Sequence, residues 1–212
     1  MTTLHGYWRS GAAYRVRLAL NIKGVAYDQV AHDLRKGEQG AAAFLVLQPQ
    51  GLVPALATDD GAVLIQSLAI MEWLEEAYPS PALLPSGLAD RAVVRAMAAL
   101  VACDIHPLNN LRVLKALRSD FGAEEAQVQR WIARWIEAGF APLEGLIGQH
   151  GAGFCFGDSP TIADCCLIPQ VYSARRFNVD LGAFPQIAAV ADRAGREPSF
   201  IAAEPERQPD AD

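Results

Sequence analysis

Residues 2–31 decide the fold of this chain, and they read TTLHGYWRSGAAYRVRLALNIKGVAYDQVA. A short segment rich in strand-forming residues, Thr2–Trp8, is followed by Ala12–Ile22, whose apolar positions recur at helical spacing. Gly24 marks the end of that helix, because glycine is favoured just after a helix C-terminus. Ala26–Ala31 then predicts a second strand, so the chain opens as strand, helix, strand. Three basic residues of the helix fall mostly outside its apolar positions: Arg15, Arg17 and Lys23.

A hairpin and a second helix complete the first eighty residues. The apolar runs Ala55–Thr58 and Ala62–Ile65 flank an Asp-Gly turn, which is a strong hairpin signal. Ser67 precedes an apolar segment with helical spacing, and serine is a favoured N-cap. We therefore expect a small α/β domain over residues 1–80.

Beyond a proline-rich break at residues 79–87, the sequence is helical in pattern. Thr161 and Asp164 precede an apolar run at the spacing of a capping box, with aspartate in place of glutamate. The last residues, Glu204–Asp212, contain little apolar mass, so we expect a loose tail. The expected fold class is α/β plus all-α, with a helical domain over residues 86–212. Its expected helices cover residues 88–117, 124–149, 161–174 and 185–196.

Composition and charge exclude several functional classes. The 212 residues carry 18 Lys and Arg against 24 Asp and Glu, a formal charge of −6, and no basic run, which argues against nucleic-acid binding. The first residues lack the features of a signal peptide, and the longest uncharged stretch, Gln39–Thr58, is broken by prolines, so no membrane span is expected. Four cysteines without a C-x-x-C pair predict neither a disulfide framework nor a metal site. We expect a reduced, cytoplasmic protein.

Three segments of the first domain carry residues suited to chemistry. Ser10 stands where the first strand meets the first helix, and a hydroxyl at a helix N-terminus suits an anion or a thiolate. Pro54 opens a strand after Val53, and Gln66 and Ser67 open a helix, again a place for an anion. Each feature also has a simpler interpretation: helix capping by the two serines, and an ordinary entry from a loop into a strand.

A fourth segment, Cys103–Arg112, places an acid, a histidine, two amides and an arginine around Pro107. Proline interrupts a helix, and polar groups at this density require hydrogen-bond partners. The segment is either part of a site or a satisfied polar network within a helix bundle. The residues alone leave both interpretations open.

Taken in order, these residues resemble the zeta class of glutathione transferases, and within it the maleylacetoacetate and maleylpyruvate isomerases. The resemblance covers essentially the whole chain and implies the glutathione transferase fold, with an N-terminal thioredoxin-like domain and a C-terminal helical bundle. Two of the matching blocks, Asp104–Arg112 and Pro169–Leu181, are specific within transferases. The matching blocks are Arg9-Ser10, Arg15-Val16-Arg17-x-Ala19-Leu20, Val53-Pro54, Gln66-Ser67-x-Ala69-Ile70, Asp104–Arg112, Pro160-Thr161-x-Ala163-Asp164 and Pro169–Leu181.

The resemblance implies glutathione as the cofactor and assigns residues to it. Val53 would pair through its main chain with the cysteinyl part, beside a cis peptide bond at Pro54. The γ-glutamyl end would lie at Gln66 and Ser67, on a helix N-terminus, and Gln50 would lie near the glycyl end. Two further contacts would come from the other subunit of a homodimer: His106 and Asn110.

The implied reaction converts a maleyl keto-diacid to its fumaryl isomer, in the degradation of aromatic compounds. The glutathione thiolate adds to the double bond, the bond rotates, and the thiolate leaves. Ser10 is the candidate donor to the thiolate, assisted by the Gly11 N–H and by Arg9. The substrate is a diacid, and planar arginine suits carboxylates better than lysine does. The candidate substrate-binding residues are Arg9, Arg112 and Arg176, although most arginines are solvated surface charges and Arg175 stands beside the last.

One position departs from the family pattern. Many zeta enzymes read Ser-Ser-Cys where this chain reads Ser10-Gly11-Ala12, so no protein thiol is available there. This departure favours the bacterial maleylpyruvate group, in which glycine also follows the serine. Tyr7 resembles the catalytic tyrosine of other transferase classes only by its position in the first strand, and we expect it in the core.

Two alternatives remain open. The same fold serves general transferases, which conjugate glutathione to electrophiles or remove halogen from halogenated acids. A catalytically inactive glutathione-binding protein would keep the fold without the chemistry, although the presence of Ser10, Arg9 and Arg176 favours an enzyme. The sequence does not separate maleylpyruvate from maleylacetoacetate, because both present a maleyl diacid with a keto group.

Overall fold

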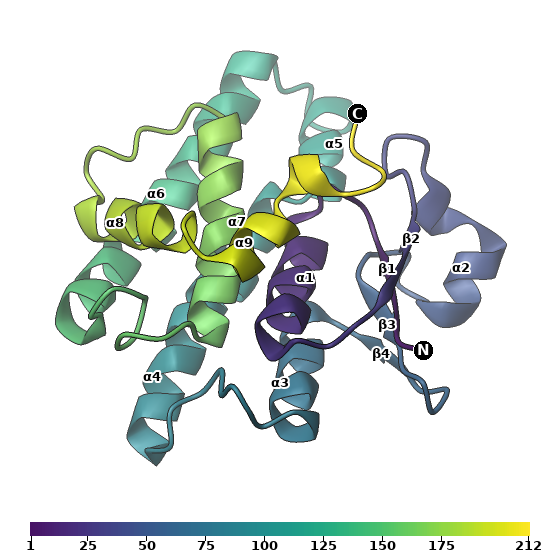
Figure 1. Cartoon of the computed structure of the whole chain (residues 1–212). Helices are drawn as coiled ribbons and strands as arrows, with labels where there is room; N and C mark the ends of the chain where they lie inside the picture. The colour runs from purple at the N-terminus through teal and green to yellow at the C-terminus, as the bar shows by residue number, and fades with distance from the viewer. The chain divides into compact units, whose positions relative to one another are not determined.

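The computed structural model describes all 212 residues, which form two compact units. The first unit joins residues 1–83 to residues 195–212, and the second comprises residues 84–194. Residues 195–212 therefore differ from the expected division, which grouped them with the helical domain. The reason is that α9 (Pro198–Ala203) packs against α1 (Gly11–Lys23), as Figure 1 shows. No helix is both long enough and apolar enough to cross a membrane.

A mixed four-stranded sheet forms the centre of the first unit, in the order β2-β1-β3-β4. β1 (Thr3–Gly6) pairs in parallel with β2 (Asp28–Ala31), and α1 connects them, as predicted. β3 (Ala55–Ala57) runs antiparallel to β1 and forms the predicted hairpin with β4 (Val63–Ile65). The remaining helices are α3 (Ser67–Ala77), which was predicted, and η1 (Glu38–Gly40) and α2 (Ala42–Leu47), which were not.

The three cations of α1 are buried, although they fall mostly outside the apolar positions of its sequence. α1 packs against two other helices, α3 and α9. Each cation reaches polar partners that make its burial tolerable. Lys23 Nζ lies 2.5 Å from a carboxylate oxygen of Glu75 and donates to the carbonyl oxygens of Tyr78 and Pro81, at 2.7 Å each.

The second unit is helical throughout its named elements, as expected. The stretch 88–117, predicted as one helix, is interrupted around Pro107, where a π-helical turn passes into a 3-10 turn. Gly139 allows a close approach there, because a Cβ atom on it would lie 2.2 Å from Ile105 Cγ1. The elements are α4 (Leu88–Ala99), η2 (Leu100–Ile105), η3 (His106–Asn109), α5 (Leu111–Ser119), α6 (Glu125–His150), α7 (Ile162–Arg176) and α8 (Pro185–Ala194).

The C-terminal segment is not the loose tail that its composition predicts. It forms a short 3-10 turn, η4 (Pro205–Arg207), and Gln208 beyond it is buried. The Gln208 side chain donates to the carbonyl oxygens of Ala202 and Glu204 and accepts from Gln29 of β2. These hydrogen bonds, of which the one from Gln29 is long-range, supply the order that the apolar content of the segment alone would not supply.

The predicted capping box at the start of α7 is present. Asp164 is fully buried, and one of its carboxylate oxygens accepts from the N–H and hydroxyl of Thr161, at 2.7 and 2.9 Å. The other oxygen accepts from the N–H of Cys155 at 2.7 Å. The box therefore ties the loop before α7 to the helix N-terminus.

We expect Asp164→Ala to lower the free energy of unfolding by about 3 kcal/mol, because three buried donors lose their acceptor. Asp164→Asn keeps one acceptor oxygen and should lose less. Urea denaturation of the purified variants measures both values. Asp158→Ala, which removes an exposed carboxylate of the same loop, is the control and should change stability by less than about 0.5 kcal/mol. Equal stability of Asp164→Ala and this control would contradict the assignment.

Candidate functional site

The turn between β1 and α1 places a serine hydroxyl at a helix N-terminus. Ser10 is the N-cap of α1, and its Oγ accepts from the Ala13 N–H at 3.2 Å. The simpler interpretation of Ser10 as a helix cap is therefore correct. Capping uses only the acceptor side of the hydroxyl. A hydroxyl that accepts one hydrogen bond still has its own proton to donate. Gly11 is the first residue of α1, and the Arg9 guanidinium lies 5.1 Å from the centre of the Trp8 ring.

The Val53–Pro54 peptide bond is cis, as the resemblance implied. Both residues are buried, and the hydrogen-bonded ladder of β3 begins at Ala55. Val53 belongs to the same apolar cluster as Tyr7 and Trp8, the two residues that lead into the turn of Ser10. Tyr7 is buried, as predicted. The cis-proline segment and the serine turn are therefore held by one core.

The N-terminus of α3 is arranged differently from the prediction. The N-cap is Gln66, which adopts a positive φ of 70°, and Ser67 is the first helical residue, so the prediction of Ser67 as the cap is wrong. No side chain caps this helix, and no acidic residue occupies its first turn. Ser67 is buried, and its Oγ accepts from Nη1 of Arg15 at 3.3 Å. An uncapped helix N-terminus with a cation behind it suits a carboxylate.

Three glutamine side chains form a chain of amides beside this helix end. Gln66 Nε2 donates to Gln50 Oε1 at 2.7 Å, so the structure brings together two residues that were assigned separately. The backbone N–H of Gln50 donates to Gln48 Oε1, also at 2.7 Å. Gln48 is buried, and sequence reasoning did not assign it a role. The only signal for it was its position two residues before Gln50.

Three of the site residues predicted in the second unit lie where the long helix is interrupted: His106, Asn110 and Arg112. Asn110 is the N-cap of α5, and its Oδ1 accepts from the N–H of Arg112 at 3.1 Å. His106 opens η3 and is half-buried, whereas Arg112 is exposed. The neighbouring backbone is tied to α6, because the carbonyl oxygen of Leu108 accepts from Trp131 Nε1 at 2.9 Å. The structure leaves open both interpretations of this segment, as part of a site and as a polar network within the helix bundle. The segment contains hydrogen-bonded polar groups and also presents side chains to solvent.

The structure distinguishes the two adjacent arginines at the end of α7. Arg175 is exposed, and its Nη2 lies 3.9 Å from an oxygen of Asp192 on α8. Arg176 is the last residue of α7, and its guanidinium lies 4.4 Å from the centre of the Phe177 ring. A guanidinium stacked on an aromatic ring is held in orientation, and its planar set of N–H groups has the geometry that binds carboxylates.

Comparisons with known proteins identify the domains of this chain. Residues 4–82 match the N-terminal domain of glutathione S-transferases, and residues 125–197 match their C-terminal domain. The chain is 53% identical to the maleylpyruvate isomerase of Ralstonia sp, over 98% of this chain and 99% of that protein.

Two solved structures are also similar to the chain. One is the holo structure of maleylpyruvate isomerase, described as a bacterial zeta-class glutathione S-transferase, with a TM-score of 0.96 and 51% identity over 99% of this chain and 100% of that one. The other is maleylacetoacetate isomerase from Methylobacterium extorquens AM1 with bound malonate and glutathione. It has a TM-score of 0.95 and 38% identity, covering 99% of each chain.

Proposed function

The chain belongs to the zeta class of glutathione S-transferases, and from that premise we propose that it is a glutathione-dependent isomerase that converts a maleyl keto-diacid to its fumaryl isomer. The substrate is maleylpyruvate or maleylacetoacetate. The observation that carries this proposal is the 53% identity to a maleylpyruvate isomerase over nearly the full length of both proteins. The comparisons include isomerases named for each of the two substrates, so the choice between them stays open.

The first unit contains the groups that glutathione requires. We propose that the Val53 main chain binds its cysteinyl part beside Pro54, and that Gln50 binds near the glycyl end. The γ-glutamyl carboxylate lies at Gln66 and Ser67, where the α3 amides have no side-chain cap. In the second unit, His106 and Asn110 are proposed to contact glutathione bound to the other subunit of a homodimer.

When bound, glutathione supplies a thiolate that adds to the alkene carbon conjugated with a carbonyl and leaves after the bond has rotated. Ser10 donates its hydroxyl proton toward the sulfur, and Gly11 adds a backbone N–H at the positive end of α1. Both interactions favour the thiolate over the thiol, which lowers the pKa of the sulfur. Arg9, Arg112 and Arg176 bind the carboxylates and the negative charge that develops on the carbonyl oxygen.

Support for the diacid comes from a similar protein that was solved with malonate, a dicarboxylate, and glutathione bound. We place the protein in the cytoplasm, in the degradation of aromatic compounds. The alternative is a general transferase of the same fold. It would be favoured if the protein conjugated electrophiles but left maleyl acids unchanged.

The purified protein with glutathione should convert maleylpyruvate or maleylacetoacetate to the fumaryl isomer, followed by the change in ultraviolet absorbance. The reaction without glutathione is the control and should show no enzymatic turnover. Conjugation of a chloronitrobenzene with no turnover of either acid would establish the alternative.

Replacing Arg176 with alanine should lower kcat/KM for the acid substrate by about 10–100-fold, the amount expected for losing a hydrogen bond between charged groups. Glutathione affinity should stay near that of the wild type. Arg175→Ala is the matched control, because Arg175 pairs with Asp192, and it should change kcat/KM by less than about twofold. A fall in melting temperature that accounts for the activity lost by Arg176→Ala would assign that residue to structure.

Gln48→Ala should weaken glutathione binding by about five- to tenfold, measured by calorimetry, because the Gln50 N–H loses its acceptor. Gln48→Glu keeps an acceptor oxygen and should restore part of the affinity. Gln129→Ala removes an exposed amide on α6 and should bind as the wild type does. Wild-type affinity of Gln48→Ala would remove the amide chain from the site.

A further inference from the structure

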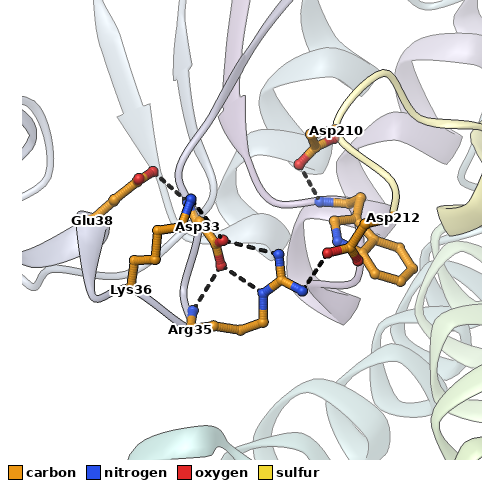
Figure 2. A network of polar contacts seen from close by, with 7 residues as sticks. Asp33, Arg35, Lys36, Glu38, Asp210 and Asp212 are labelled. Atoms are coloured by element: carbon orange, nitrogen blue, oxygen red, sulfur yellow. Dashed lines mark hydrogen bonds and ion pairs between the residues drawn. The ribbon is translucent and has the colours of Figure 1, made fainter.

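The C-terminal segment is fastened to the turn that precedes Ser10. The backbone N–H of Trp8 donates to Oδ2 of Asp210 at 2.9 Å, across 202 positions of sequence. Trp8 is buried, and Figure 2 shows the Asp210 carboxylate on the C-terminal coil with its hydrogen bond drawn as a dashed line. A carboxylate that accepts from a buried backbone N–H forms a charge-assisted hydrogen bond, which is stronger than a neutral one.

The carbonyl group of Trp8 is also held by a hydrogen bond. The carbonyl oxygen of Trp8 accepts from Arg17 Nη2 at 2.9 Å, and Arg17 Nε donates to the carbonyl oxygen of Ala203 at 3.1 Å. The turn then closes through the Ser10 N–H, which donates to the Tyr7 carbonyl oxygen at 2.9 Å. Both peptide groups of Trp8 are therefore held from outside the turn, one of them by Asp210.

A second anchor keeps Asp210 in place. Arg35 binds Asp33 through two N–H groups, at 2.9 Å each, and a third reaches Asp212, so the guanidinium lies between the two carboxylates in Figure 2. Arg35 also holds the pKa of Asp33 well below its usual range. Between the two anchored aspartates, Ala211 packs on the apolar cluster that contains Trp8 and Val53.

We propose that Asp210 is a positioning residue for the thiolate site: its carboxylate fixes the Trp8 peptide and, through the turn, the places of the Ser10 hydroxyl and the Gly11 N–H. The inference rests on the proposed function. Donors to a developing or stabilised anion act only when they are held in position, and misplacement by about 1 Å is costly. On this proposal, the C-terminal segment that carries Asp210 supports the thiolate site.

The test compares Asp210→Ala with Asp210→Asn in the full-length protein. The readouts are the pKa of bound glutathione, followed by thiolate absorbance against pH, and kcat/KM for isomerisation. Asp210→Ala should raise the thiol pKa by about one unit and lower kcat/KM by about tenfold, because the Ser10 hydroxyl and the Gly11 N–H would be misplaced. Asp210→Asn keeps an oxygen acceptor for the Trp8 N–H and should stay close to the wild type.

The sign of the pKa shift separates positioning from direct electrostatics. Removing a negative charge near a thiolate lowers its pKa, and it does so equally in both variants. A lowered thiol pKa in both would therefore overturn the proposal. Arg207→Ala breaks an exposed ion pair with Glu204 in the same segment and is the control, expected to match the wild type.

The remaining outcomes also test the positioning role of Asp210. If Asp210→Ala lowers the melting temperature but leaves thiol pKa and kcat/KM unchanged, Asp210 only fastens the tail and the proposal is wrong. If Asp210→Ala does not fold, Asp210→Glu keeps the charge but moves the acceptor, and it should raise the thiol pKa; an unchanged value overturns the proposal. Failure of the wild type to bind glutathione overturns the proposed function as well, whereas a fully active Asp210→Ala overturns the positioning role alone.

Discussion

The buried guanidinium of Arg17 constrains the first unit more than any other single group. Arg17 lies in the middle of α1 and is almost completely inaccessible to solvent, with 1% of its surface exposed. A charge can be buried only where its N–H groups find acceptors, so backbone must be present on more than one side of the helix. Trp8, ahead of the helix, and Ala203, in α9, supply carbonyl oxygens, and the Tyr14 ring lies 5.1 Å away. The beginning and the end of the chain are thereby fastened to the same helix.

Local signals predicted the order of elements well. The strand-helix-strand opening, the hairpin at its Asp-Gly turn and the capping box of Thr161 and Asp164 each depend on residues within a few positions of one another. The burial of the α1 cations was not predictable in this way. A periodicity argument assumes one apolar face, whereas α1 packs against both α3 and α9. Its cations meet polar groups from distant segments, which are the Ser67 hydroxyl for Arg15, the Ala203 carbonyl oxygen for Arg17 and the Glu75 carboxylate for Lys23.

The site residues also differ in whether their arrangement depends on neighbouring or on distant parts of the sequence. Ser10, Gln50 and Gln66 were assigned from the resemblance, which depends on short blocks with a recognisable spacing, and their roles toward glutathione stay predictions. Ser67 was misplaced by one position because Gln66 adopts a positive φ, which residue propensity does not foresee. Asp210 gave no signal, since the amide it binds is 202 positions away. The roles of His106 and Asn110 toward a second subunit stay predictions.

Gly139 has a consequence for anyone who wishes to make this protein more heat-resistant. Glycine inside a helix costs about 1 kcal/mol relative to alanine, so exchanging such glycines for alanine is a common engineering choice. On α6, Gly145 has open space where a methyl group would go, and the exchange is compatible with its surroundings. At Gly139 the same methyl group would collide with Ile105, whose side chain occupies the notch that the glycine leaves. Two glycines six residues apart on one helix thus call for opposite decisions.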